Sequence, residues 1–440
     1  MDQANTPPSL APSARRRAIL SSVIGNGLEW FDFGIYSSFS VIIASLMFPA
    51  HDKAITLLVA FASFGVAFVV RPIGGVMLGM YADRVGRKSA LTTIILMMAL
   101  GTLIIGLTPT YATIGVAAPI LILLARMLQG FSAGGEFASA TAILLEYAPP
   151  RHRNFVGSFQ SCSQALSFAL GGAVAYLLMH NLQPESLHTW GWRLPFLLGS
   201  LIGPLGFYIR SRVDESPEFA AYITQRHKTP VERLSLAGIV RRYPRELLAT
   251  LGIVAVGTTS TYICLIYLPL FATAQLGLQQ SDGQLGMFAG AMVLLVMCPV
   301  TGWLADRFGR RAVMLPAILL FGWLAHWLIG SVVHAPSLAV MIRFEVLSAL
   351  LMSFFWGPSS AALAEAFPVQ IRSTSMAVVY NLGAMIFGGL APLINAWLTR
   401  MTGDQMAPAW YITLSAAIAA LGVMAMVPHP VSRRCTASTT

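Results

Sequence analysis

The sequence predicts an all-α membrane protein, with 12 transmembrane helices arranged in two six-helix halves. The prediction rests on composition, on recurring apolar runs and on an internal repeat. Of 440 residues, 56% are hydrophobic and only 10% are charged, whereas about 25% are charged in ordinary soluble domains. The mean hydropathy is +0.69. The charged residues are too few to cover the water-exposed surface of a soluble domain, and we expect a lipid bilayer to be the solvent.

The individual spans are bounded by glycine, proline or charged residues. Their apolar runs approach the ~20 residues that a helix needs to cross a ~30 Å hydrocarbon layer. An even number of spans places both chain ends on the same side. The predicted spans are 18–46, 55–81, 89–108, 113–147, 154–180, 194–210, 246–274, 284–304, 312–333, 337–366, 373–399 and 408–427.

Polar segments divide and flank these spans. Residues 1–17 are mostly polar and proline-rich, and they predict a disordered cytoplasmic tail rather than a secretory signal. The longest polar stretch, 211–245, predicts a cytoplasmic linker between an N-terminal half, 18–210, and a C-terminal half, 246–427. Residues 428–440 predict a cytoplasmic C-terminal tail.

The distribution of basic residues predicts the orientation. Twenty-two of the 28 lysines and arginines fall in the tails or in alternate loops. The positive-inside rule therefore places both termini and the linker in the cytoplasm. Because membrane topology accounts for the net charge of +10, we expect no nucleic-acid partner.

Metal, nucleotide and hydrolase signatures are missing from the sequence. The four cysteines have neither metal-ligand nor disulfide-framework spacing, and the histidines lack metal-ligand spacing. There is no Walker loop and no nucleophile elbow. We therefore expect no enzymatic activity and no metal. The cysteines are Cys162, Cys264, Cys298 and Cys435.

An internal repeat supports two halves. The segment GMYADRVGRK at 79–88 returns as GWLADRFGRR at 302–311. A second pattern, Glu, Pro and Arg at 146–153, returns at 365–372. Each pattern follows the same span of its half, so the halves are expected to be parallel duplicates related by an axis along the membrane normal.

The duplicated Gly-x-x-x-Asp-Arg-x-Gly-Arg pattern resembles the signature loop of the major facilitator superfamily. Four further segments are similar to its metabolite:proton symporters: GNGLEWFDF at 25–33, RPIGG at 71–75, RMLQGFSAGGE at 126–136 and WGWRLPF at 190–196. That branch carries citrate, α-ketoglutarate, shikimate and proline or betaine, and the citrate-proton symporters look nearest. The resemblance implies alternating access in a bacterial inner membrane, with the proton as coupling ion and no other cofactor.

In that family the loop aspartate latches the two halves together at the cytoplasmic side. Asp83 and Asp306 follow predicted helices, where the negative end of the helix dipole disfavours a carboxylate unless cations or another helix N-terminus stabilise it. For each basic residue alone, a role as topology marker remains an alternative. The candidate latch residues are Asp83, Arg84, Gly86, Arg87, Glu146, Arg153, Asp306, Arg307, Arg310, Glu365 and Arg372.

Ionisable residues inside spans are candidates for function, because each costs ~2.5 kcal/mol or more at a helix centre. Glu29 and Asp32, three apart, share one face of the first span. Arg126 and Glu136, ten apart, lie roughly on one face of the fourth span. A buried ion pair that only fixes helix packing is the structural alternative.

The functional interpretation makes Asp32 the group that takes up and releases the coupling proton. Arg126 would stabilise the ionised carboxylate in one conformation and move away in another. Proton-driven sugar porters also pair an acid of helix one with an arginine of helix four. Glu136 and Glu29 are the alternative proton carriers.

Substrate contacts are expected from polar side chains in the first, fourth, fifth, seventh, tenth and eleventh spans, and from Arg71 of the second. Arginines offer bidentate hydrogen bonds to carboxylates. Arg343 and Glu345, two apart in the tenth span, are expected to form a local ion pair. The candidate substrate residues are Asn26, Tyr36, Arg71, Arg126, Gln160, Gln164, Tyr262, Tyr380 and Asn381.

Together these patterns predict a proton-coupled symporter of a small organic carboxylate of the citrate or dicarboxylate class, working as a monomer in the bilayer. Alternatives are a carrier of shikimate or of a zwitterionic osmolyte such as proline or betaine. Trp30, Phe31, Tyr36 and Trp356 could cradle the quaternary ammonium of betaine. An uncoupled facilitator or a membrane receptor is the alternative from a different class.

Overall fold

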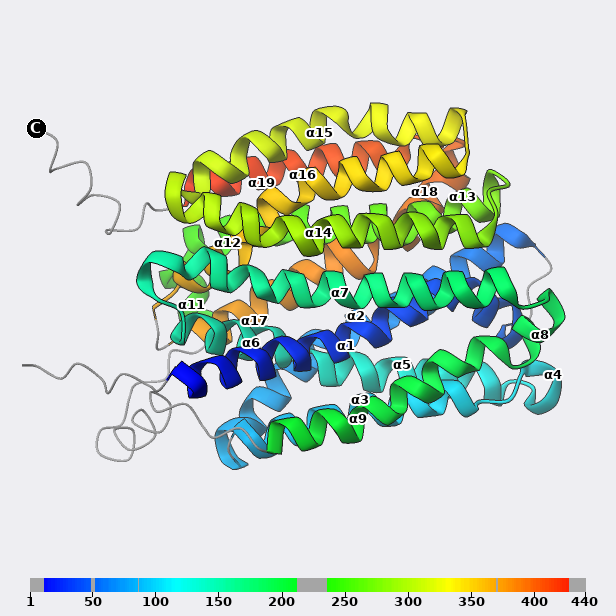
Figure 1. Cartoon of the computed structure of the whole chain (residues 1–440), viewed down its shortest axis with the longest axis horizontal. Coiled ribbons are helices and arrows are strands. Elements are labelled where there is room, and N and C mark those ends of the chain that lie inside the picture. Colours follow the sequence, from blue (N-terminus) through cyan, green and yellow to red (C-terminus); the bar gives the residue numbers. More distant parts are fainter. Residues whose placement is uncertain (1–11, 49–51, 86, 212–235, 369–370, 427–440) are drawn as a thin grey trace, which may run out of the picture.

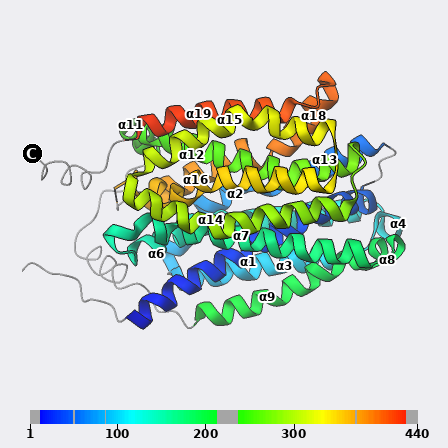
Figure 2. The ribbon, with the colours of Figure 1, turned by 45° about the horizontal axis from the view of Figure 1, so that its top comes forward.

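The structure is a computed structural model, and it describes residues 12–48, 52–85, 87–211, 236–368 and 371–426. Its long helices run side by side, parallel or antiparallel, along the long axis of a single bundle (Figures 1 and 2). Helices of the first half of the chain occupy one side of the bundle and those of the second half occupy the other.

The first half contains six spans joined by short connections. Its fourth span is interrupted between two helices at Gly134 and Gly135. The helices are α1 (Pro12–Met47), α2 (Lys53–Val85), α3 (Arg87–Leu107), α4 (Tyr111–Ile114), α5 (Ala117–Ala133), α6 (Glu136–Glu146), η1 (Pro150–His152), α7 (Arg153–Asn181), α8 (Pro184–Thr189), η2 (Gly191–Arg193) and α9 (Leu194–Ser211).

The second half contains six further spans, and two of them include a π-helical turn. The helices are α11 (Leu236–Arg242), α12 (Pro244–Tyr262), the π turn η3 (Ile263–Tyr267), α13 (Leu268–Gln275), α14 (Gln280–Phe308), α15 (Arg310–His334), α16 (Leu338–Glu365), α17 (Arg372–Gly383), the π turn η4 (Ala384–Gly389), α18 (Ala391–Thr402) and α19 (Ala407–Ala425).

Each of the 12 predicted spans corresponds to a helix or to a run of helices in the structure, and the predicted fold class is confirmed. Within the described residues, ten spans are long and apolar enough to cross a membrane, and 92–107 is a shorter apolar helix. The twelfth span is α9. The predicted linker lies partly outside the described residues, with α11 at its end, and the predicted domain boundaries stay a prediction.

The described chain begins and ends at the same end of the bundle, here called the terminal end (Figure 1). The first described residue, Pro12, and the last, Met426, both lie there. The other end, where α1 finishes and α19 starts, is called the opposite end. The predicted charge rule would place the terminal end in the cytoplasm.

Glycines bring α2 and α5 into backbone contact and so fix how the two helices are positioned along each other. A Cβ at Gly130 would collide with the Ala67 carbonyl oxygen, and one at Gly74 with that of Phe131. Only small residues permit so close an approach of two helices in a membrane. Arg71 therefore lies level with the break at Gly134, whereas Arg126 lies about two helical turns away along α5, level with Phe64 of α2.

Candidate functional site

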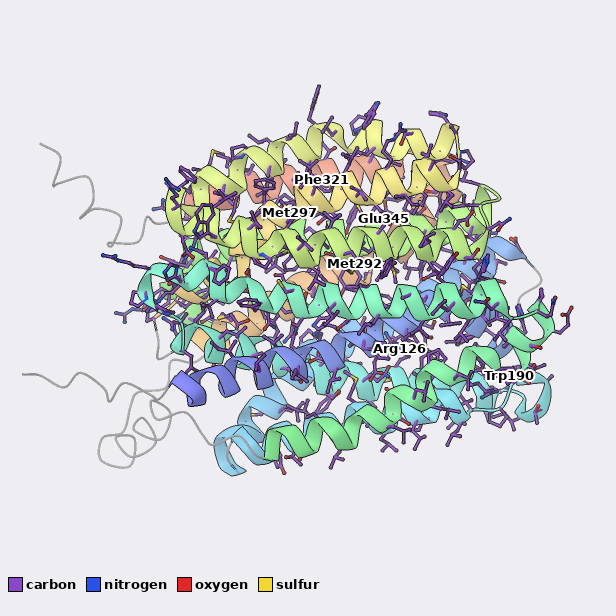
Figure 3. The ribbon with its side chains drawn as sticks, in the orientation of Figure 1. Arg126, Trp190, Met292, Met297, Phe321 and Glu345 are labelled. Atoms are coloured by element: carbon purple, nitrogen blue, oxygen red, sulfur yellow. The ribbon has the colours of Figure 1, made fainter. Side chains whose placement is uncertain are left out.

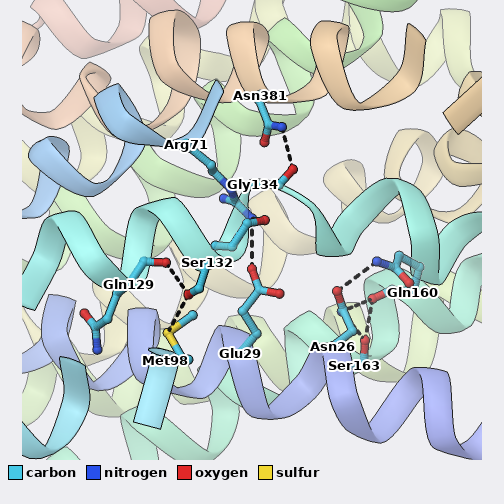
Figure 4. Close-up of polar contacts among 11 residues, drawn as sticks. Asn26, Glu29, Arg71, Met98, Gln129, Ser132, Gly134, Gln160, Ser163 and Asn381 are labelled. Atoms are coloured by element: carbon cyan, nitrogen blue, oxygen red, sulfur yellow. Dashed lines mark hydrogen bonds and ion pairs between the residues drawn. The ribbon is translucent and has the colours of Figure 1, made fainter. Parts of the chain in front are cut away.

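Arg71 of α2 is completely buried and reaches Glu29 of α1 (Figure 4). Its Nη2 atom donates to Glu29 Oε1 at 3.1 Å and to the Ala133 carbonyl at 3.4 Å. Its Nε and Nη1 atoms have no hydrogen-bond partner. Two of its N–H groups are therefore available to a ligand.

Aromatic rings surround the Arg71 guanidinium. Its central carbon lies 5.3 Å from the ring centroid of Trp30, 5.5 Å from that of Phe68 and 5.7 Å from that of Tyr380. Cation–π attraction of this kind is worth roughly 0.5–2 kcal/mol per desolvated contact. The rings thus stabilise a buried cation that Glu29 pairs with through one nitrogen.

Arg126 of α5 is also completely buried. It donates to Gln129 Oε1 at 2.8 Å and to the Phe64 carbonyl at 3.1 Å. The Tyr36 ring covers its guanidinium at 4.1 Å. Arg126 is thus held by neutral partners.

Asp32 is connected to Arg126 indirectly. Thr102 of α3 donates to Asp32 Oδ2 at 2.6 Å, and Gln129 Nε2 donates to Thr102 Oγ1 at 2.9 Å. Gln129 in turn accepts from Arg126. A chain of three hydrogen bonds therefore links the predicted proton carrier to the predicted cation, with no ion pair between them in this conformation.

The three candidate acids of the first half line one pocket. Glu29 and Asp32 reach it from α1 and Glu136 from the first turn of α6, while Gly199 and Gly203 of α9 form the facing wall. All three acids are buried, at 2–6% exposure. The pocket therefore brings the predicted carrier and both alternatives together.

Two tyrosines of the second half lie among the aromatic rings around the buried arginines. The Tyr262 ring lies against Phe64 and Phe68 at 5.9 and 5.2 Å. The Tyr380 ring stacks on Phe137 at 3.5 Å between centroids. Both tyrosine hydroxyls are buried without a hydrogen-bond partner. The predicted substrate residues Arg71, Tyr262 and Tyr380 therefore meet where the two halves touch.

The candidate amides occupy three different places. Asn26 and Gln160 bond to each other at 2.8 Å, and Asn26 also donates to Ser163 (Figure 4). Asn381 of α17 donates to the Gly134 carbonyl at the break between α5 and α6, at 2.7 Å. Gln164 is buried, and its Nε2 atom lacks a partner. Asn26 and Gln160 thus join α1 to α7, while Gln164 keeps a free donor.

The aromatic residues considered for an ammonium cage have other contacts. Trp30 and Tyr36 cover the two arginines. Trp356 donates from Nε1 to Thr261 Oγ1 at 3.0 Å. Phe31 is only partly buried. They do not form one cage in this conformation.

Asp306 joins the halves at the terminal end. It lies in the last turn of α14. It accepts from the backbone N–H groups of Asn154 and Phe155, at 3.0 and 2.9 Å, and from the Asn154 side chain at 2.8 Å. A Cβ at Gly302 would lie 2.8 Å from the Asn154 carbonyl oxygen. The aspartate therefore caps the N-terminus of α7, a helix of the other half.

Glu365 adds ion pairs at the same place. It accepts from Arg153 at 3.0 Å and from Arg310 at 2.7 Å. Arg310 also donates to Asn154 Oδ1 at 2.6 Å. Four of the predicted latch residues, Arg153, Asp306, Arg310 and Glu365, therefore form one network between α7 and the C-terminal half.

Two further latch candidates belong to the described residues. Arg307 is exposed beside Trp303 and Phe308, and Arg372 begins α17. The other candidates, Gly86 and the side chains of Asp83, Arg84, Arg87 and Glu146, lie outside the described part of the chain.

The opposite end is closed as well. The Phe61 ring of α2 packs on Tyr267 of η3 at 5.4 Å, and Arg400 lies 3.5 Å from Asp52. Both contacts connect the two halves. The structure therefore has its halves in contact at both ends, as in an occluded conformation.

Sequence reasoning missed two connecting residues and was wrong about one ion pair. Thr102 and Gln129 were not assigned a role, although Gln129 follows Arg126 by one helical turn. Arg343 and Glu345 do not pair: Arg343 is exposed, 5.6 Å from the Trp327 ring, while Glu345 is fully buried. Residues two apart point to different helix faces.

Comparison with known proteins identifies relatives over nearly the whole chain. The family model described as Major Facilitator Superfamily matches residues 23–321, and the model described as Sugar (and other) transporter matches 227–432. A citrate-proton symporter of Klebsiella pneumoniae is 36% identical over 406 residues, which cover 92% of this chain and 90% of that protein.

Two further similarities concern an osmolyte carrier and a solved structure. A proline/betaine transporter of Salmonella typhimurium is 34% identical over 410 residues, covering 92% of this chain and 81% of that protein. The crystal structure of a D-xylose-proton symporter superposes with a TM-score of 0.72 at 19% identity, covering 94% of this chain and 98% of that one. The latter similarity shows the fold.

Proposed function

Since the chain belongs to the major facilitator superfamily, we propose that it is a proton-coupled symporter that imports a small organic carboxylate by alternating access. The main support for this proposal is Arg71, a buried cation at the boundary between the halves whose Nε and Nη1 donors have no hydrogen-bond partner. The similarity to a citrate-proton symporter supports the same substrate class.

The free polar atoms at the centre favour a ligand rich in acceptors. Arg71 Nε and Nη1, Gln164 Nε2 and the hydroxyls of Tyr262 and Tyr380 are buried without partners. The arginine and amide nitrogens can only donate, and a carboxylate only accepts. Charge-assisted bonds from arginine to carboxylate are also about twice as strong as neutral ones.

The charges of the site couple the proton to the anion. Arg71 and Arg126 are the cations of the site, and Glu29, Asp32 and Glu136 are its acids. When Asp32 binds a proton, the site becomes more positive by one charge, and its attraction for an anion increases. Because linkage is reciprocal, a bound anion then favours protonation of Asp32 by the same factor.

The zwitterionic osmolyte is the second candidate, favoured by the similarity to a proline/betaine transporter. Its carboxylate could use the same donors. Its ammonium group would need aromatic faces, and those of Trp30 and Tyr36 lie over arginines here. The arrangement therefore supports a carboxylate without a cationic group.

We further propose that the protein works as a monomer in a bacterial inner membrane, with the terminal end in the cytoplasm and no enzymatic step. The proton is the proposed coupling ion, with no other cofactor. An uncoupled facilitator would equilibrate its substrate, whereas a symporter would concentrate it. Saturable uptake into proteoliposomes that an inward proton gradient drives and an uncoupler abolishes is the expected result.

A thermal-shift screen identifies the substrate class. Citrate, tricarballylate, α-ketoglutarate, shikimate, proline and betaine are each added to purified protein, since a ligand of the folded state raises the melting temperature. A di- or tricarboxylate should stabilise the wild type and not the Arg71→Gln variant. Stabilisation by betaine or proline alone would replace the carboxylate proposal with the osmolyte one.

A further inference from the structure

Glu345 is a buried acid outside the site described above. It lies on α16, about two turns from the helix start, and its side chain points toward α14. It belongs to the C-terminal half, whereas Arg126 belongs to the N-terminal half (Figure 3). Its side chain has no solvent exposure. Neither carboxylate oxygen has a hydrogen-bond partner.

The surroundings of Glu345 are uncharged. From α14 it faces Gly286 and Gly290, and a Cβ at Gly290 would lie 2.8 Å from Oε2. From η3 it faces the thiol of Cys264, a titratable group that lies beside Ser348. No arginine, lysine or histidine of the described chain pairs with Glu345, and Arg343 on its own helix is exposed.

An ionised carboxylate cannot remain in such a place without strong cost, because nothing replaces its hydration. The neutral acid has only one O–H to satisfy. The group is therefore protonated while it is enclosed, and it can ionise when water reaches it. Glu345 lies near the opposite end of the bundle, so opening of that end is the event that would admit water.

The π turn η3 connects Glu345 to the closure of the opposite end. One of its residues, Cys264, lies beside Ser348, one turn after Glu345 on α16, and is near enough to Glu345 to interact with it electrostatically. Another, Tyr267, packs on Phe61 of the N-terminal half. Tyr267 also lies 3.4 Å from Thr399 of α18. The same five-residue turn thus packs on α16, the helix that carries Glu345, and contacts the N-terminal half.

We propose that Glu345 is a proton-binding site that couples protonation to closure of the opposite end. On closure the carboxylate takes one proton from water to give the neutral acid, and on opening the acid returns that proton to water. The proton comes from and returns to the same side, so this step adds nothing to the transported charge. It makes the opposite end sensitive to the pH of the solution that it faces.

The sign of the effect follows from linkage. The closed form binds one more proton than the open form, so a rise in pH favours opening. With one proton exchanged, the ratio of open to closed molecules rises by at most about tenfold per pH unit. A neutral glutamine cannot exchange a proton, so the Glu345→Gln variant should lose this dependence and stay closed.

The test measures the distance between the halves at the opposite end. Spin labels on Gln183→Cys and Gln279→Cys, both exposed positions before α8 and α14, report opening in nanodiscs without substrate. Cys435 is replaced by serine, and the other three cysteines are buried. The control is Glu185→Gln, which removes an exposed acid from the same end.

Wild type, Glu185→Gln and Glu345→Asp should show a growing long-distance population from pH 6 to pH 9, and Glu345→Gln should not. Infrared spectra should also show a protonated-carboxyl band in the closed wild type that Glu345→Gln lacks and Glu185→Gln retains. A wild-type distance distribution that does not change with pH overturns the proposal. The same holds if the response persists in Glu345→Gln, or if its spectrum matches the wild type in that band. None of these measurements requires the transport substrate, so the outcome is independent of the proposed function.

Discussion

Replacement of Asp32 by asparagine separates transport from coupling. The asparagine side chain keeps one oxygen that can accept from Thr102, as Asp32 Oδ2 does at 2.6 Å, so the hydrogen-bond chain to Arg126 should persist. The amide is neutral, like the protonated acid. Position 32 then keeps the charge of the protonated acid at every pH.

Substrate affinity of Asp32→Asn should therefore stay within a few-fold of the wild type at low pH and lose its pH dependence. In the wild type, one linked proton lets affinity fall by up to about tenfold per pH unit once the site deprotonates. Accumulation should be lost, because a gradient of one pH unit supplies ~1.36 kcal/mol per coupled proton, or about tenfold concentration.

The assay compares counterflow with gradient-driven uptake in proteoliposomes. Asp32→Asn should exchange substrate but leave it at equal concentrations inside and outside, whereas Arg126→Gln should impair both activities. Glu185→Gln, which removes an exposed acid, is the matched control. If Asp32→Asn accumulates substrate to the wild-type level, Asp32 is not the carrier, and Glu29 or Glu136 takes its place.

Three further predictions concern the latch, the packing and the topology. Asp306→Asn should favour opening of the terminal end by about 5- to 30-fold, since a carboxylate at a helix N-terminus contributes ~1–2 kcal/mol. Unchanged accessibility of cysteines introduced at that end would contradict the latch role. Asp83→Asn is expected to act in the same direction. Gly74→Ala should lower the melting temperature through a backbone collision costing ~1–3 kcal/mol, whereas Gly79→Ala, whose Cβ would meet nothing, should not. A reporter fused after Arg226 should lie in the cytoplasm and one inserted near Asp282 outside, and the reverse result would overturn the charge argument.

The number of spans and their order could be predicted from the sequence because lipid imposes a simple length rule. Rotation of each helix about its axis could not. In a helix that is apolar all round, no polar face marks the side that points to lipid. Sequence spacing therefore placed Arg126 and Asp32 in the right helices but could not show that Thr102 and Gln129 lie between them.

The direct partner of Arg71 was hidden for a related reason. Glu29 and Asp32 share a helix face, and only the packing of α2 against α5 decides which of them an arginine reaches. The glycines of that packing, Gly74 and Gly130, are visible in the sequence, but their collision partners are backbone atoms of another helix. The latch candidates could be proposed from the sequence because the repeat marks them twice, and their role stays a prediction.

The two buried arginines differ in how their charge is balanced. Arg71 has an ionised partner, Glu29, at 3.1 Å, whereas Arg126 bonds to an amide and a backbone carbonyl. Lysine could not replace either, since a guanidinium both stacks on rings and donates in a fixed plane. Arg126 is connected to Asp32 by hydrogen bonds through the neutral side chains of Gln129 and Thr102. Arg71 keeps its Nε and Nη1 donors free. A proton on Asp32 thus leaves Arg126 without a counter-charge, and an anion that bonds to Arg71 between the halves supplies it.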